Sequence, residues 1–213
     1  MKNIYSQAYQ QQLKINLNKF DIKDSKVQNK IHNFCKKFGF NHEEVIQNIS
    51  TNPFLKSFFI KDPSHQNVYK KTLFSHLQTI PFINKLQLLE TDNEQPSYIV
   101  QQKVVHDSPV PTGKVKSADI YFKINGLPYD FYVYHKYTKN KGGSQDSQKN
   151  EIIKVMQTAR NLTGAINKKI KVLIVLDGNY YTNKILKELQ TSAPNNFHIL
   201  NSTHIAPFLK QLQ

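Results

Sequence analysis

The chain has 213 residues, a formal net charge of +14 and a sequence pI near 9.7. This length suits one domain, or a small helical region joined to a core of about 150 residues. Hydrophobic residues make up 38% of the chain, which excludes wholesale disorder. Because 29 cationic residues stand against 15 acidic ones, we expect a polyanionic partner, either nucleic acid or an acidic membrane surface.

The membrane alternative has little support in the sequence. The chain contains no run of 18 apolar residues, and its first residues lack the apolar region of a signal peptide. Cys35 is the single cysteine, which excludes an intramolecular disulfide and a cysteine-based zinc site. These features predict an intracellular, cytoplasmic protein with no membrane partner.

The N-terminal part of the sequence has helical periodicity. Apolar spacing and capping patterns predict helices over residues 6–17, 24–38 and 41–49. A longer helix is expected to begin at Asp62 and to end before Pro81. We therefore expect an N-terminal helical region over residues 1–62 and an α/β core over residues 63–213.

Beyond Pro96 the apolar period changes to that of strands. The Asn125-Gly126 pair between two β-rich segments is a strong hairpin signal. The predicted strands are residues 98–105, 118–124, 129–137, 170–176 and 197–200, and the predicted helices are 144–162, 183–190 and 205–212. This order predicts an α/β fold in which a mixed sheet is flanked by helices.

A carboxylate and a lysine fall on the two adjacent strands of the predicted hairpin. Asp119 lies at the start of one strand and Lys136 near the end of the next, where strand alternation places Tyr132, Tyr134 and Lys136 on one face. The carboxylate can bind a divalent cation, and the lysine can polarise an attacking water and offset charge that develops on a phosphate. The pair therefore suits metal-dependent phosphodiester hydrolysis.

This segment resembles a known family. Asp119, the hairpin and Tyr134-His135-Lys136 are similar to the PD-(D/E)xK nuclease core, particularly that of type II restriction endonucleases. The resemblance continues through segments 142–151 and 172–181 and covers roughly residues 52–205. It implies a restriction-endonuclease-like sheet, with Asp119 and Glu151 as Mg²⁺ ligands and Lys136 as the residue that activates water. It also implies that the backbone carbonyl of His135 contacts the metal.

The sequence departs from the family at Tyr134, where the family has an acid. A phenol is a poor Mg²⁺ ligand, and Asp130 lies six residues before Lys136, about 20 Å along a strand. Glu151 follows Lys136 by 15 positions and lines up with Gln148 on the predicted helix. A subset of restriction endonucleases is similar, with the second acid on this helix. Tyr134 either fills the space of the lost carboxylate in an active variant or marks an inactive site.

Each candidate residue also has a plain structural interpretation. Asp119 could be an ordinary strand-entry residue, Lys136 a solvated edge residue, and Glu151 an acid that interacts favourably with the helix dipole. Taken together within the family-like frame, we interpret the three as functional.

Polar and basic residues around the Gly142-Gly143 loop are candidates for contacts to DNA phosphates. They are Lys139, Lys141, Ser144, Gln145, Gln148 and Lys149. A solvated surface would show the same cluster, so both interpretations stay open.

The sequence thus predicts a Mg²⁺-dependent endonuclease of the type II restriction class that cuts double-stranded DNA. A homodimer is expected, because cuts in both strands of a symmetric site suit a two-fold protein. The main alternative is a catalytically degenerate nuclease fold that binds nucleic acid or a partner subunit without cleaving. A nuclease acting on RNA, or on branched or single-stranded DNA, is a weaker alternative.

Overall fold

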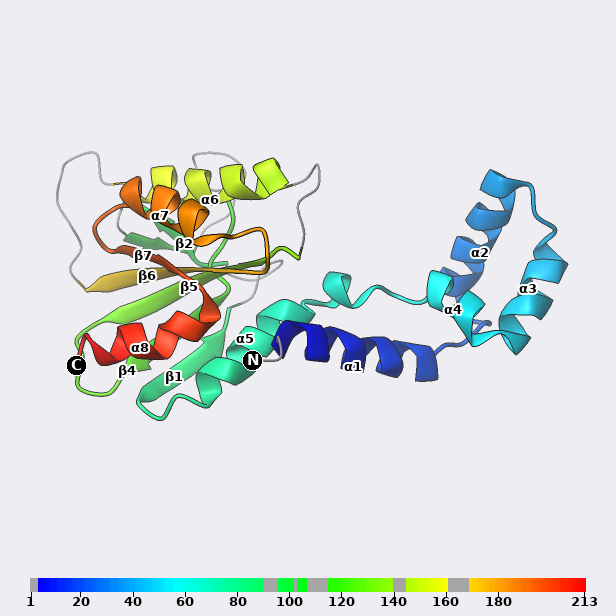
Figure 1. Ribbon diagram of the computed structural model, residues 1–213, viewed down its shortest axis with the longest axis horizontal. Coiled ribbons are helices and arrows are strands. Elements are labelled where there is room, and N and C mark those ends of the chain that lie inside the picture. The colour runs from blue at the N-terminus through cyan, green and yellow to red at the C-terminus, as the bar shows by residue number, and fades with distance from the viewer. Residues whose placement is uncertain (1–3, 90–95, 102, 107–114, 140–144, 161–168) are drawn as a thin grey trace. The chain divides into compact units, whose positions relative to one another are not determined.

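The computed structural model describes residues 4–89, 96–101, 103–106, 115–139, 145–160 and 169–213. The chain forms two compact units, Met1–Thr72 and Leu73–Gln213 (Figure 1). The sequence prediction placed this division at residue 62. Asp62 and the turn after it belong to the first unit, where the Asp62 carboxylate accepts hydrogen bonds from the backbone N–H and the hydroxyl of Ser64.

The first unit is built from short helices whose ends are set by capping residues. They are α1 (Ile4–Asn18), α2 (Ser25–Phe38), α3 (His42–Thr51), α4 (Pro53–Phe59), the 3₁₀ turn η1 (Pro63–Gln66) and the first residues of α5 (Val68–Gln78). Asp24 caps α2 by accepting hydrogen bonds from two backbone N–H groups, and Asn41 caps α3 in the same way. Gly39 ends α2 in the left-handed conformation. The three predicted N-terminal helices are therefore present.

The core of the first unit explains the cysteine. Ile31, Cys35, Ile49 and Phe59 are buried together, so Cys35 is a small apolar core residue. The sequence prediction missed α4, which begins directly after the Asn52 cap. The helix predicted from Asp62 is also interrupted, because Asn67 takes a positive φ of 55° between η1 and α5.

The second unit is a five-stranded mixed sheet, which confirms the predicted α/β fold. Its strands are β1 (Ile83–Leu88), β4 (Ile120–Ile124), β5 (Asp130–Tyr137), β6 (Ile170–Asp177) and β7 (Phe197–Leu200). They pair in the order β1-β4-β5-β6-β7, antiparallel up to β5 and parallel from β5 to β7. The segment predicted as one strand over 98–105 is instead a small hairpin, β2 (Tyr98–Val100) and β3 (Lys103–Val105), because Gln101 turns at a φ of 46°.

Helices cover both faces of this sheet (Figure 1). On one face, α6 (Gln145–Ala159) and α7 (Asn183–Thr191) pack on Tyr134, Ile174 and their neighbours. On the other face, the last residues of α5 and α8 (Ile205–Lys210) pack on Val133, Leu173 and theirs. Since successive strand residues point to opposite faces, Tyr134 and Lys136 belong to the α6 face and His135 to the opposite one. None of the described helices is both long enough and apolar enough to span a bilayer.

Candidate functional site

The candidate residues converge where β4 begins and β5 ends, on the sheet face covered by α6. Ile120 pairs with Val133 in the antiparallel register, so Asp119, one residue before β4, lies opposite Tyr134. Lys136 lies two residues further along β5, on the same face as Tyr134. Glu151 comes from the middle of α6, beside the buried Ile152.

The Asp119 carboxylate lies over the end of β5. Asp119 is 6% exposed, and its Oδ2 accepts a 2.7 Å hydrogen bond from the backbone N–H of His135. The N–H and C=O of one strand residue leave the strand on the same side. The carbonyl of His135, predicted to contact a metal, therefore points to the same side of β5 as the Asp119 carboxylate.

Lys136 and Glu151 form an ion pair between β5 and α6. The Nζ of Lys136 lies 2.6 Å from Oε2 of Glu151, and the two side chains are 23% and 34% exposed. One turn earlier on α6, Gln148 accepts a hydrogen bond from the hydroxyl of Thr138, just after β5. These two contacts fix the first half of α6 against the end of β5.

Lys116 is the fourth ionisable group of the site. Its side chain is 15% exposed, it pairs with Oδ2 of Asp119, and its Nζ lies 5.7 Å from the ring centre of Tyr134. Burial lowers the pKa of Lys116, and the positive charge of Lys136 lowers it further, whereas Asp119 and Glu151 act in the opposite direction. Two lysines and two carboxylates thus interact within one region.

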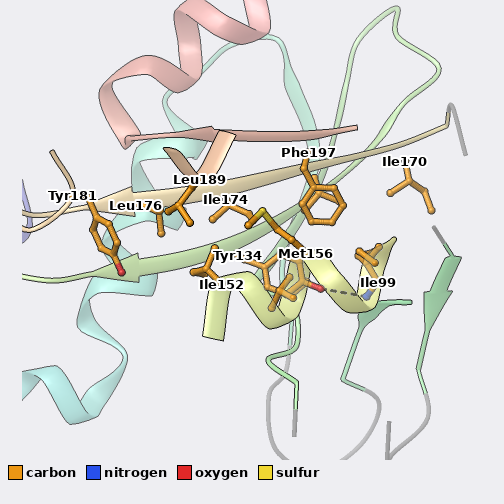
Figure 2. Close-up of a cluster of buried hydrophobic side chains, with 14 of the residues drawn as sticks. Ile99, Tyr134, Ile152, Met156, Ile170, Ile174, Leu176, Tyr181, Leu189 and Phe197 are labelled. Atoms are coloured by element: carbon orange, nitrogen blue, oxygen red, sulfur yellow. Dashed lines mark hydrogen bonds between the residues drawn. The ribbon is translucent and has the colours of Figure 1, made fainter. Parts of the chain in front are cut away.

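Tyr134 is a core residue. It is 1% exposed, and its hydroxyl oxygen accepts a 3.2 Å hydrogen bond from the backbone N–H of Ile99 (Figure 2). Ile152 and Met156 of α6 surround the ring. Burial raises the pKa of Tyr134 well above its ordinary value, so the hydroxyl stays neutral. Its ring fills space under α6 and its hydroxyl is directed at the β2 backbone, not at Lys136.

A second buried polar group lies on the opposite face, behind the site. The Nε2 of His135 lies 3.4 Å from Oδ2 of Asp177, the last residue of β6. Asp177 Oδ1 accepts hydrogen bonds from the backbone N–H and the hydroxyl of Ser202, at 3.0 and 2.9 Å. This group links β5, β6 and the turn before α8, so we assign it a structural role.

Gly178 lies against the chain just after β5, at the end of the sheet where the candidate site lies. It has a φ of 100°, and a Cβ placed on it would lie 2.6 Å from the carbonyl carbon of Thr138. Thr138 donates its N–H to the Asp177 carbonyl at 2.8 Å, and Tyr180 donates its own to the Thr138 carbonyl at 3.4 Å. The backbone after β6 can approach the end of β5 this closely because residue 178 has no side chain.

Three of the residues predicted to contact DNA have side chains within the described part of the chain, one after β5 and two on α6. Lys139 is exposed after β5, and Lys149 on α6 lies 3.4 Å from Glu188 on α7. Gln148 bonds to Thr138, as described above. Lys141, Ser144 and the side chain of Gln145 lie outside the described residues.

Two contributors to the site carried no signal in the sequence. Lys116 lies three residues before Asp119, a spacing that places side chains on opposite faces of a regular strand. The segment before β4 is irregular, and the long lysine side chain reaches Asp119. Thr138 follows β5 as an ordinary polar residue, and the glycine that accommodates it lies 40 positions away. Within the described chain, no group of three or more His, Cys, Asp or Glu side chains could hold a metal ion.

Comparisons with known proteins include a distant structural similarity. No protein-family model matches the sequence, and no curated protein matches it. Among solved structures, the chain is similar to the crystal structure of protein VC1899 from Vibrio cholerae, with 11% sequence identity and a TM-score of 0.34. The alignment covers all of this chain and 56% of that one, so the chain spans little more than half the length of that protein. A similarity this weak carries no statement about function, and the resemblance to PD-(D/E)xK nucleases stays a prediction.

Proposed function

We propose that the protein is a divalent-metal-dependent endonuclease that hydrolyses phosphodiester bonds of double-stranded DNA, similar to type II restriction enzymes. The observation that carries the proposal is the convergence of Asp119, Lys136 and Glu151, from three elements, on one face of the sheet. Lys136 contacts Glu151 at 2.6 Å, and both interact electrostatically with the lysine that pairs with Asp119. Carboxylates and a lysine around one point are the groups that phosphoryl hydrolysis requires.

The donor set at this point fits a hard divalent cation such as Mg²⁺. Asp119 and Glu151 each use one oxygen in the contacts above, and within the described part of the chain the other oxygen makes no hydrogen bond. Mg²⁺ is commonly held by one or two carboxylates together with water and substrate phosphates, so two carboxylates are sufficient. The backbone carbonyl of His135 is the third oxygen on that side.

In the proposed reaction, a water oxygen attacks phosphorus and the bond from phosphorus to the 3′ oxygen breaks. One product end carries the 5′ phosphate. The attacking water releases a proton to solvent, and the departing 3′ oxygen takes one up from solvent water. The bound cation would polarise the phosphate and neutralise part of its charge. The ammonium of Lys136, held in place by Glu151, orients the water and offsets the negative charge that grows on the phosphate.

The charge of the chain supports DNA as the substrate. A net charge of +14 favours association with a polyanion, and Lys139 stands exposed directly after the strand that carries Lys136. We propose a homodimer for the same reason as above: a duplex cut in both strands presents two equivalent bonds to a two-fold protein.

Two observations favour the alternative, a nuclease fold that binds nucleic acid without cutting it. The carboxylates that would hold a metal are paired with lysines, and the usual acidic position is occupied by the core residue Tyr134. A Tyr134→Glu substitution would place a carboxylate in the apolar core, so it is a poor test. Binding measured alongside cleavage separates the two functions directly.

The test is cleavage of mixed plasmid DNA in Mg²⁺ by the wild-type protein and by Lys136→Ala. Lys123→Ala is the matched control, because Lys123 of β4 also pairs with a carboxylate, that of Asp130 on β5 at 2.9 Å, away from the candidate site. We expect wild type and control to cut, and Lys136→Ala to be slower by about a hundredfold or more. A wild-type protein that retains DNA in a gel-shift assay but leaves every sequence uncut would favour the binding protein.

A further inference from the structure

Lys116 stands where a cation would be expected to approach Asp119. It contacts Oδ2 of Asp119 and, like that carboxylate, is largely withdrawn from water, with side-chain exposures of 15% and 8%. The other contact to Oδ2 comes from a backbone N–H, which cannot leave without disturbing β5. The lysine is therefore the mobile partner of this oxygen.

The charges of the site balance without any bound ion. Lys116 and Lys136 together neutralise Asp119 and Glu151. A divalent cation entering between the two carboxylates would add two positive charges next to both ammonium groups, at separations where charges in a partly buried site interact strongly. Its binding is therefore opposed for as long as Lys116 stays at Asp119.

We propose that Lys116 is an internal competitor for the divalent cation, which lowers the metal affinity of the protein and neutralises Asp119 in the ion-free state. This inference rests on the proposed function, because it assumes that Asp119 and Glu151 hold the metal. Lys116 acts through Asp119, so it is a positioning residue.

The test measures Mn²⁺ affinity of the full-length protein, from the electron paramagnetic resonance signal of the free ion. The variants are Lys116→Met, which removes the charge and keeps an unbranched side chain, and Lys116→Arg, which keeps the charge. Lys123→Met is the matched control, since it breaks a lysine–aspartate pair between β4 and β5, away from the site.

We expect Lys116→Met to bind Mn²⁺ about tenfold or more tightly than wild type does. The free energy of this tightening is a small part of the repulsion between two positive charges at contact distance. Lys116→Arg and Lys123→Met should stay within about threefold of wild type. A role limited to stability would weaken folding without tightening metal binding. If Lys116→Met does not fold, Lys116→Gln, which keeps a hydrogen-bond donor, replaces it with the same expected direction.

Unchanged or weaker Mn²⁺ binding by the uncharged variant overturns the inference, as does equal tightening in the control. If wild type cuts DNA with Mg²⁺ while the Lys116 variants bind Mn²⁺ like wild type, this inference fails and the proposed function stands. If no variant binds Mn²⁺ and wild type cuts no DNA, both fail.

Discussion

Replacing Gly178 by alanine is expected to damage the end of β5 that carries the candidate site. Gly178 has a φ of 100°, and an added Cβ would lie 2.6 Å from the carbonyl carbon of Thr138 and closer still to its oxygen. Thr138 cannot simply move away, because its N–H is bonded to the Asp177 carbonyl and its hydroxyl to Gln148 on α6. The substitution therefore forces a backbone shift in the strand end.

The magnitude follows from two costs. A non-glycine residue at this φ costs about 1 to 3 kcal/mol, and the steric overlap adds about 1 to 3 kcal/mol. We expect Gly178→Ala to lose about 3 to 5 kcal/mol of unfolding free energy, and to lose DNA cleavage as Lys136 and Glu151 separate. Gly126→Ala is the control: its φ is 79°, but nothing lies within 4 Å of the added Cβ, so it should lose about 1 to 2 kcal/mol.

The assay is urea-induced unfolding followed by far-ultraviolet circular dichroism, since the chain has no tryptophan. Equal losses for Gly178→Ala and Gly126→Ala would refute the reasoning, because both glycines have positive φ and they differ in the contact with Thr138. Full cleavage activity in a destabilised Gly178→Ala would show that the strand end does not position the site.

Three further predictions follow from individual contacts. Burial, and to a lesser degree Lys171, lowers the pKa of His198 to about 4, so between about pH 4 and 6.5 the unfolded chain binds more protons than the folded one and stability falls as the pH falls. When the pH is lowered from about 7 to 5, His198→Phe should lose about 2 kcal/mol less unfolding free energy than wild type does. Equal losses in the two proteins would contradict this. Tyr134→Phe leaves the buried backbone N–H of Ile99 without its acceptor, so the unfolding free energy in urea should fall by about 1 to 3 kcal/mol while cleavage persists. Loss of cleavage in a variant that still folds would assign Tyr134 a catalytic role. Lys149→Ala breaks a half-exposed ion pair and should change the unfolding free energy by less than about 0.5 kcal/mol. It should nevertheless lower the DNA affinity, and the slope of the logarithm of the binding constant against the logarithm of the salt concentration should become shallower by about 0.9. An unchanged slope would remove Lys149 from the DNA contacts.

The α/β fold was predictable because its strongest signals are local. Asp24 and Asn41 lie at helix starts that the sequence marks, and the apolar strand Ile170–Asp177 lies inside the sheet, between β5 and β7. The elements that were missed have weak or broken patterns. β1 is a polar edge strand whose register shifts after Asn84, so it shows no clean alternation.

The candidate site was predictable as far as strand and helix periodicity reach. Alternation along β5 placed Lys136 on the face that α6 covers, and helical spacing placed Glu151 towards it. The contacts of Lys116 and Gly178 depend on irregular backbone and on residues distant in sequence, which periodicity does not encode. The direction of Tyr134 into the core depends likewise on its long-range bond to Ile99.

The most direct test of the account is single-turnover cleavage of DNA in Mg²⁺ by wild type, Asp119→Asn, Lys136→Ala and the double variant. If the two residues belong to one active centre, each single substitution should slow cleavage by about a hundredfold or more, and the double variant should be little slower than either single one. Wild-type cleavage rates in Asp119→Asn, or the absence of cleavage by the wild-type protein itself, would contradict the account.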